Sequence, residues 1–205
     1  MCHKHALNLS ISQSSKVLAI RNAVCRIKDT TFLLNASAKR SAVLTKKLEK
    51  KLTLLCETRW IERHDSITQF RCLLPKIVNI LSCISKWKDV DTALKAQGLV
   101  KSLSNSETIV AIICLSDLLT CTKSLSEYFQ RVNIDILSAK KELDITFKLL
   151  NRRREKSDQY FKSLFDEIKG VAQELGVEIK VPRITKRQVH RENYPSDDPE
   201  TYYRR

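Results

Sequence analysis

The sequence predicts an all-α fold, and three observations support this prediction. The chain of 205 residues contains only three glycines and four prolines, and most of these follow residue 169. The first 169 residues therefore contain few helix-ending residues, and an all-β chain would need many more turn residues. Apolar residues recur there at steps of three and four, which places them on one face of a helix. Hydrophobic residues make up 42% of the chain, enough for a folded core.

Two helices are expected within the first 50 residues. The first runs from Ala6 to Leu34. Its apolar residues at helical spacing are Val17, Leu18, Val24, Ile27 and Leu34. The second runs from Ala38 towards Leu48, with Ser37 as its N-cap and a lysine-rich polar face.

A long helix is expected to follow. Its apolar stripe consists of Trp60, Ile67, Phe70, Leu74, Ile77, Leu81, Ile84 and Trp87. Such a stripe needs a partner helix to cover it. Pro75 lies inside the stripe, so we expect a kink or a division of the helix at this residue.

The next segment predicts a short helix and then a largely buried one. Asp89 or Asp91 begins the short helix, which passes through Leu94 and Leu99. Ser104 and Glu107 have the spacing of a capping box, which starts the buried helix. This helix includes Ile109 to Leu119, and Leu125 to Phe129 continue it.

Two further helices are predicted over Ile134–Leu150 and Ser157–Leu175, with the basic run from Asn151 to Lys156 as a bend between them. The residues expected to face inward are Ile136, Leu137, Leu143, Phe147 and Leu150 in the first, and Tyr160, Leu164, Phe165, Ile168, Val171, Ala172 and Leu175 in the second. Gly176 is placed as the residue after the helix end. The helical region is therefore predicted over 1–176, and 177–205 is predicted to be a linker or tail in which Val177 to Val181 resembles an unpaired strand.

The net charge of +14 is unevenly distributed. From Met1 to Leu55 there are eleven Lys and Arg residues but only two acids, Asp29 and Glu49. This excess favours a polyanionic partner, either nucleic acid or an anionic membrane surface. A basic surface that serves only solubility is the alternative, and charge alone does not separate the two.

The seven cysteines include no Cys-x-x-Cys pair and are odd in number, which favours a reducing compartment. Met1 to His5 is not followed by the apolar stretch of a secretory signal, and no long apolar run predicts a membrane span. We therefore expect an intracellular protein that is not secreted.

Neither a metal site nor a catalytic site is predicted. Cys2, His3 and His5 are zinc-type donors, but a closed zinc site needs about four ligands, and His64 and His190 are distant in sequence. Cys2 and His5 are instead expected to pack locally. The carboxylates are dispersed, and there is no Gly-rich phosphate loop or nucleophile elbow.

Three blocks of sequence resemble the hAT superfamily of DNA transposases. The first is Cys2-x-x-His5 followed by Leu7-Asn8-Leu9, and the second is Ser37-Ala38-Lys39-Arg40, similar to a Ser-x-Lys-Arg block of the family. The third runs from Cys56 to Asp65 and contains Thr58-Arg59-Trp60, which is similar to the Thr-Arg-Trp block. The three blocks have the order and approximate spacing of the family.

The resemblance implies that this chain is a multi-helix insertion domain of a ribonuclease-H-like core, with an irregular C-terminal tail. In that family the insertion separates two catalytic aspartates from a glutamate. Those acids, and a C-terminal dimerisation region for self-association, would lie outside this chain. We therefore expect no enzymatic activity and no cofactor in this chain, a divalent metal only in a complete transposase, and a nuclear location.

The resemblance also implies DNA-contacting residues. In the family, the tryptophan that matches Trp60 supports a flipped base, and the preceding arginine, here Arg59, lies beside it. The blocks add Arg63, Lys39 and Arg40 to this set. Stacking of an unstacked base on an aromatic ring is worth about 1–3 kcal/mol. Two alternatives remain open: Trp60 only starts the apolar stripe of its helix, or the chain is a helical scaffold that binds another protein through an exposed apolar groove.

Overall fold

The computed structural model describes residues 17–48, 52–55, 60–131, 133–182 and 198–204. Every regular element in these residues is a helix, which confirms the all-α prediction for the described part of the chain. The helices are α2 (Leu18–Asn35), α3 (Ala38–Leu48), α4 (Trp60–Ile84), α5 (Val90–Leu103), α6 (Ser106–Phe129), α7 (Ile136–Glu155), α8 (Ser157–Glu174) and α9 (Pro199–Arg204).

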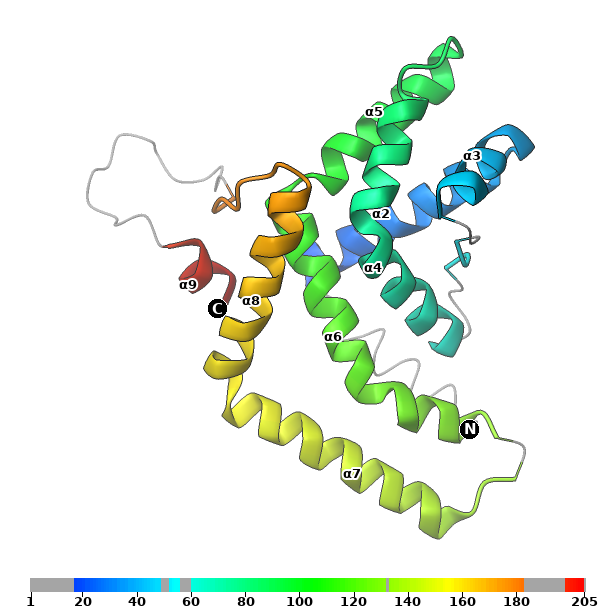
Figure 1. The fold of residues 1–205 in the computed structure, drawn as a ribbon. Coiled ribbons are helices and arrows are strands. Elements are labelled where there is room, and N and C mark those ends of the chain that lie inside the picture. The colour runs from blue at the N-terminus through cyan, green and yellow to red at the C-terminus, as the bar shows by residue number, and fades with distance from the viewer. Residues whose placement is uncertain (1–16, 49–51, 56–59, 132, 183–197, 205) are drawn as a thin grey trace.

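Helix α6 lies at the centre of the arrangement. It packs against α2 and α4 on one side and against α7 and α8 on the other (Figure 1). Five consecutive residues of α6, from Ile109 to Ile113, are buried, so apolar side chains cover all sides of the helix at this level. A helix of this composition is stable only when other helices surround it, and the structure confirms the predicted burial.

The predicted apolar stripe of α4 is confirmed from Ile67 to Ile84, while Trp87 follows the helix and is partly buried. Six of its residues are fully buried, namely Ile67, Phe70, Leu74, Ile77, Leu81 and Ile84. Pro75 removes one backbone hydrogen bond, but it does not divide the helix. The buried residues before and after Pro75 belong to one core, and this packing keeps both halves in a single helix.

Helix α2 buries Ile27 and Leu34 as predicted, whereas Val17 and Leu18 are exposed, contrary to the prediction. These two residues lie at the start of α2, where no helix in the described part of the chain covers them. Helix α3 begins at Ala38 as predicted, and the Ser37 carbonyl accepts a hydrogen bond from the Ser41 amide at 2.8 Å.

The predicted capping box at Ser104 is wrong. Asn105 is the N-cap of α6, and its side-chain oxygen accepts a hydrogen bond from the Glu107 amide at 2.9 Å. Ser104 instead ends α5. Asp89, one of the two predicted residues, precedes α5, which buries Leu99 but leaves Leu94 exposed.

The predicted inward face of α7 is also wrong. Ile136, Leu137 and Phe147 are 82%, 78% and 57% exposed, Leu143 is exposed, and the fully buried position is Thr146. Apolar residues occur on several sides of this helix, so spacing alone does not determine its rotation. The basic run predicted to be a bend forms the last turn of α7, and the chain turns at Lys156.

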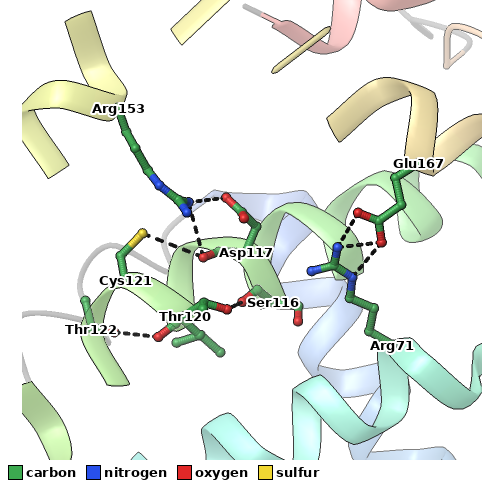
Figure 2. Close-up of polar contacts among 9 residues, drawn as sticks. Arg71, Ser116, Asp117, Thr120, Cys121, Thr122, Arg153 and Glu167 are labelled. Carbon is green, nitrogen blue, oxygen red and sulfur yellow. Dashed lines mark hydrogen bonds and ion pairs between the residues drawn. The ribbon is translucent and has the colours of Figure 1, made fainter. Parts of the chain in front are cut away.

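Two ion pairs connect the outer helices to the central ones (Figure 2). Arg153 of α7 contacts the carboxylate of Asp117 on α6, and Arg71 of α4 contacts that of Glu167 on α8. Because Arg153 projects from the side of α7 that carries Thr146, the first pair fixes the rotation of α7 against α6. The exposed apolar residues of α7 follow from this rotation.

Helix α8 buries Phe165, Ile168 and Ala172 as predicted, but Tyr160 is exposed. Gly176 has a φ of 65°, which confirms it as the residue after the helix end.

The segment after Gly176 packs on the helical region. Val177 and Ile179 contact the apolar cluster of α6 and α8, and Ser106 Oγ donates to the Glu178 carbonyl at 3.1 Å. The described residues 177–182 form no strand, and Tyr203 of α9 donates from its hydroxyl to the Lys180 carbonyl at 2.9 Å.

Two stretches of the described residues, His64–Ile84 and Ser106–Phe129, are long and apolar enough to cross a membrane by length and composition. They form most of α4 and all of α6, the central helices of the core. Core helices of this kind meet the same criterion, so the observation is weak evidence for a membrane span.

Candidate nucleic-acid interface

Helices α2 and α5 lie side by side and form a groove of about 490 Å³, here called the α2–α5 groove. Leu33 and Leu99 are buried at its floor. Gly98 lies on its wall, and no atom lies within 4 Å of the position that a side chain would occupy there. The groove is lined by Arg26, Asp29, Phe32, Leu33, Ala36, Arg40, Thr92, Lys95, Gly98, Leu99 and Ser102.

The charged lining of the groove is predominantly cationic. Arg26 comes from α2, Arg40 from the first turn of α3 and Lys95 from α5. Among the described residues, Asp29 is the only carboxylate in the lining, and its nearest cation is Arg26 at 4.0 Å. Both side chains of this pair are well exposed, so water screens their attraction. Three cations against one carboxylate make the groove attractive to an anionic ligand.

Arg40 is held in place by the opposite wall. Its Nη1 donates to the Thr92 hydroxyl at 3.0 Å, and Thr92 is buried. Thr92 also holds the pKa of Asp89 below its usual value through a side-chain hydrogen bond, and the nearby Arg40 charge contributes to the same shift. Nε of Arg40 is buried and has no hydrogen-bond partner among the described residues. The hydrogen bond to Thr92 thus orients the guanidinium at the groove wall, and a guanidinium held in this way is suited to bind phosphate.

Phe32 contributes an aromatic ring to the same groove. Its side chain is 69% exposed, although it lies on a helix whose other side is buried in the core. Lys39 lies nearby on α3, with its ammonium 4.5 Å from the centroid of the Trp87 ring in a cation–π contact. Cations beside an exposed aromatic ring are the combination that single-stranded nucleic acids bind.

The residues predicted to contact DNA do not form one site. Lys39 and Arg40 lie near the C-terminal end of α4, whereas Trp60 and Arg63 belong to its first turn. A helix of 25 residues separates these ends by roughly 36 Å. The side chains of Trp60 and Arg63 lie outside the part that the structure describes, as do Arg59, Cys2 and His5 entirely.

Sequence reasoning missed Arg26, Phe32, Thr92 and Lys95. One signal was present on α2, because Arg26, Asp29, Phe32 and Ala36 follow one another at steps of three and four. This spacing puts an aromatic residue within a polar helix face. No comparable signal links Thr92 and Lys95 to α2, since only the packing of α5 brings them together.

The polar contacts between α4, α6, α7 and α8 do not form a second candidate site (Figure 2). Each arginine is already paired with a carboxylate. Burial raises the pKa of the nearby Cys114 thiol to about 11, and the Asp117 charge acts in the same direction. A thiol with such a pKa is almost fully protonated near neutral pH and is a poor nucleophile. Within the described ranges, no group of three or more His, Cys, Asp or Glu residues could hold a metal ion.

Comparison with known proteins shows a distant relationship. The chain is 25% identical over 220 residues to the 52 kDa repressor of the inhibitor of the protein kinase of Homo sapiens, which covers all of this chain and 29% of that protein. The protein of the same name from Mus musculus is 22% identical over 200 residues, covering 89% of this chain and 26% of the relative. The chain therefore spans less than a third of the length of these curated relatives. No family model matches the chain, and no solved structure matches it significantly.

Proposed function

We propose that this chain is a helical module derived from a hAT transposase that binds DNA through its basic surface. The observation that carries this proposal is the α2–α5 groove, in which Arg26, Arg40 and Lys95 outnumber the carboxylate of Asp29. The resemblance of the three sequence blocks supports the transposase origin, and the distant relatives are compatible with it. Lys39 and Arg40 belong to one of these blocks, so the resemblance and the groove meet at the start of α3.

A salt series with charge-neutralised variants tests this proposal. The double variant Arg26→Gln/Lys95→Gln removes two exposed groove cations, and Lys76→Gln/Lys162→Gln removes two exposed cations from α4 and α8. Each phosphate that a variant no longer binds should reduce the slope of log K against log salt by about 0.9 for duplex DNA. We expect Arg26→Gln/Lys95→Gln to bind DNA more weakly and to show a shallower slope of log K against log salt, and Lys76→Gln/Lys162→Gln to bind as the parent chain does. Equal effects of the two variants, or no DNA binding by the folded chain, would overturn the proposal.

We propose further that Trp60 stacks on a base removed from the helix, with Arg59 on the neighbouring phosphate, as the resemblance implies. The test compares a hairpin-ended DNA with a plain duplex, using Trp60→Ala and the aromatic control Trp60→Phe. We expect Trp60→Ala to weaken hairpin binding about 5- to 150-fold, corresponding to 1–3 kcal/mol of stacking, and Trp60→Phe to retain most of it. If both variants bind the hairpin as the parent does, Trp60 has no such role.

The proposal assigns no DNA cleavage to this chain. A two-metal nuclease requires carboxylates that converge on a pair of ions, and within the described residues no group of three or more His, Cys, Asp or Glu could hold a metal ion. The expected outcome is that hairpin DNA incubated with the chain and Mg²⁺ or Mn²⁺ stays intact. Strand cleavage that disappears on chelation would contradict this. A protein that binds DNA in this way is expected to act in the nucleus.

A second candidate function, a scaffold for another protein, is favoured by the exposed apolar side of α7. Ile136, Leu143 and Phe147 lie within one stripe at steps of seven and four, and all three are exposed. Lys140 and Arg154 lie on the same side of the helix. This pattern fits a partner helix that presents apolar residues flanked by acidic ones.

Binding of synthetic helical peptides separates the two candidates. One peptide carries Leu at helical spacing with flanking Glu, and the control carries Lys in place of Glu. The scaffold function predicts that the chain prefers the acidic peptide and that Phe147→Ser abolishes the preference. Equal binding of both peptides, or no change in Phe147→Ser, would rule out this function for α7.

A further inference from the structure

We infer that the α2–α5 groove binds single-stranded DNA, with an unpaired base stacked on Phe32 and the neighbouring phosphates held by Arg26, Arg40 and Lys95. This inference rests on the proposed DNA binding and adds the form of DNA that the groove selects. It concerns a different end of the molecule from Trp60, since the groove lies near the C-terminal end of α4.

The exposed ring of Phe32 carries the inference. Arg26, Arg40 and Lys95 alone would attract any nucleic acid, because every phosphate backbone is anionic. An aromatic face adds a contact that a continuous duplex cannot use, since its bases are stacked on one another and turn only their edges to the grooves. Phe32 is 69% exposed and lies in the same lining as the three cations. A base can therefore stack on the ring only after it has left a duplex or in a strand that has no partner.

The size of the groove agrees with a small number of nucleotides. Its volume of about 490 Å³ lies in the range of small-ligand sites, which hold one or a few compact groups. Leu33 and Leu99 form an apolar floor, and Gly98 leaves the α5 wall low. These apolar residues belong to the same lining as Phe32, so a base stacked on the ring can also contact an apolar surface.

The cations are arranged around this aromatic ring on three helices. Arg40 is oriented by the hydrogen bond that its Nη1 donates to the Thr92 hydroxyl, and it belongs to the groove lining. Arg26 lies 4.0 Å from Asp29, a separation at which its guanidinium donors remain available to a phosphate. Lys95 projects from the opposite wall and is exposed. The three cations therefore share one lining with the ring and can bind the phosphates that neighbour a stacked base.

Among its described residues, the lining offers no side chain of the type that reads adenine through two hydrogen bonds. Asn and Gln side chains, which make bidentate bonds to adenine, are absent from its described residues, and Asp29 and Ser102 are the polar groups other than Thr92 and the cations. Stacking tolerates every base. The groove is therefore expected to select unpaired strands without a preference for adenine.

The test measures binding of the full chain to three fluorescently labelled DNAs of equal length at one salt concentration. These are an oligo(dT) strand, a duplex, and a strand with abasic sites. Phe32→Ala removes the ring, Phe32→Tyr retains it, and Arg26→Gln/Lys95→Gln removes charge from the same groove. Phe32 is exposed, so its replacement should leave the helical circular dichroism spectrum unchanged.

We expect Phe32→Ala to weaken oligo(dT) binding at least fivefold, to leave duplex binding unchanged, and to make oligo(dT) and the abasic strand equivalent. Phe32→Tyr should bind as the parent does, and the charge variant should weaken all three DNAs. If Phe32→Ala changes the binding of none of the three DNAs while the charge variant weakens the binding of all three, the stacking inference fails and the proposed DNA binding survives. If neither the parent chain nor any variant binds DNA, the stacking inference and the proposed DNA binding both fail.

Discussion

At the scale of single residues, helix starts show how one side chain determines a boundary that periodicity leaves open. Asn105 and Asp135 have extended backbone conformations and accept hydrogen bonds from the first free amides of α6 and α7. The bonds from Ser138 and Leu137 lower the pKa of Asp135, because they stabilise its charged form. Ser104 and Asn105 are both good caps by composition, and only the backbone conformation distinguishes them.

Replacement of Asn105 is therefore predicted to destabilise the protein. Asn105→Ala removes the acceptor for the Glu107 amide and should lower the free energy of unfolding by about 1 kcal/mol. Asn105→Asp keeps an acceptor at the N-terminal end of α6, where a negative charge is favourable, and should retain the parental stability. Urea denaturation of the three proteins measures the difference. An unchanged midpoint for Asn105→Ala would show that the cap makes no net contribution.

At the scale of helices, the sequence predicts a buried stripe well and helix rotation poorly. The stripe of α4 was predictable because its apolar residues share one face, and six of them are fully buried. The apolar residues of α7 surround the helix, so the contact between Arg153 and Asp117 chooses the side that faces α6. In the α2–α5 groove, the sequence blocks predicted Arg40, and the spacing on α2 could have indicated Arg26 and Phe32. Thr92 and Lys95 join the groove only through the packing of α5.

The contact between Arg153 and Asp117 is predicted to anchor α7. Arg153→Gln and Asp117→Asn should each destabilise the protein, and a double-mutant cycle should give a coupling of about 1–2 kcal/mol, since both side chains are partly buried. The exposed pair Lys169 and Asp166 is the matched control, with an expected coupling below about 0.5 kcal/mol. Hydrogen exchange should show faster exchange of α7 amides in Arg153→Gln. Equal coupling free energies for the two pairs would show that the contact between Arg153 and Asp117 does not anchor α7.

The C-terminal helix α9 is predicted to separate from the rest at high pH. Burial raises the pKa of Tyr203 to about 12, and nearby Glu107 acts in the same direction. The neutral phenol is thus favoured in the packed state. Its stabilisation is fully present below the ordinary tyrosine pKa of about 10 and is lost as the pH rises through about 12. Absorbance titration near 295 nm should show one late-titrating tyrosine that is absent from Tyr203→Phe. If the parent chain and Tyr203→Phe gave the same titration curve after division by the number of tyrosines, the packing of Tyr203 would be contradicted.

At the scale of the whole molecule, α6 joins two apolar clusters. The larger one contains residues from α2, α3, α4, α5 and α6, and the smaller one contains residues from α6 and α8 together with Val177, Ile179 and Tyr203 at its edge. Val171 of α8 and Leu175, the residue after this helix, contact both clusters. The groove that carries the proposed function is built by helices of the larger cluster. Helix α6 contributes no residue to the described lining of the groove and supports it only by packing against these helices in the core.

Substitution of two neighbouring residues of α6 tests how much each cluster contributes to the free energy of unfolding. Ile112 belongs to the larger cluster and Ile113 to the smaller one, and both are fully buried. Ile112→Ala and Ile113→Ala should each destabilise the protein by about 2–5 kcal/mol, and the milder Ile→Val changes by about 0.5–1.5 kcal/mol. Leu118→Ala, at an exposed position of the same helix, should cost far less.

Because α6 belongs to both clusters, every variant is expected to unfold in one transition, with the same midpoint by circular dichroism and by tryptophan fluorescence. Trp87 packs against the larger cluster, so in a Trp60→Phe background, where it is the single tryptophan, the fluorescence reports on that side of the molecule. If Ile113→Val or Ile113→Ala shifted the circular dichroism midpoint and left the fluorescence midpoint unchanged, the two clusters would unfold separately. The α2–α5 groove would then retain its geometry without α8, and DNA binding by Ile113→Ala at the intermediate temperature should persist.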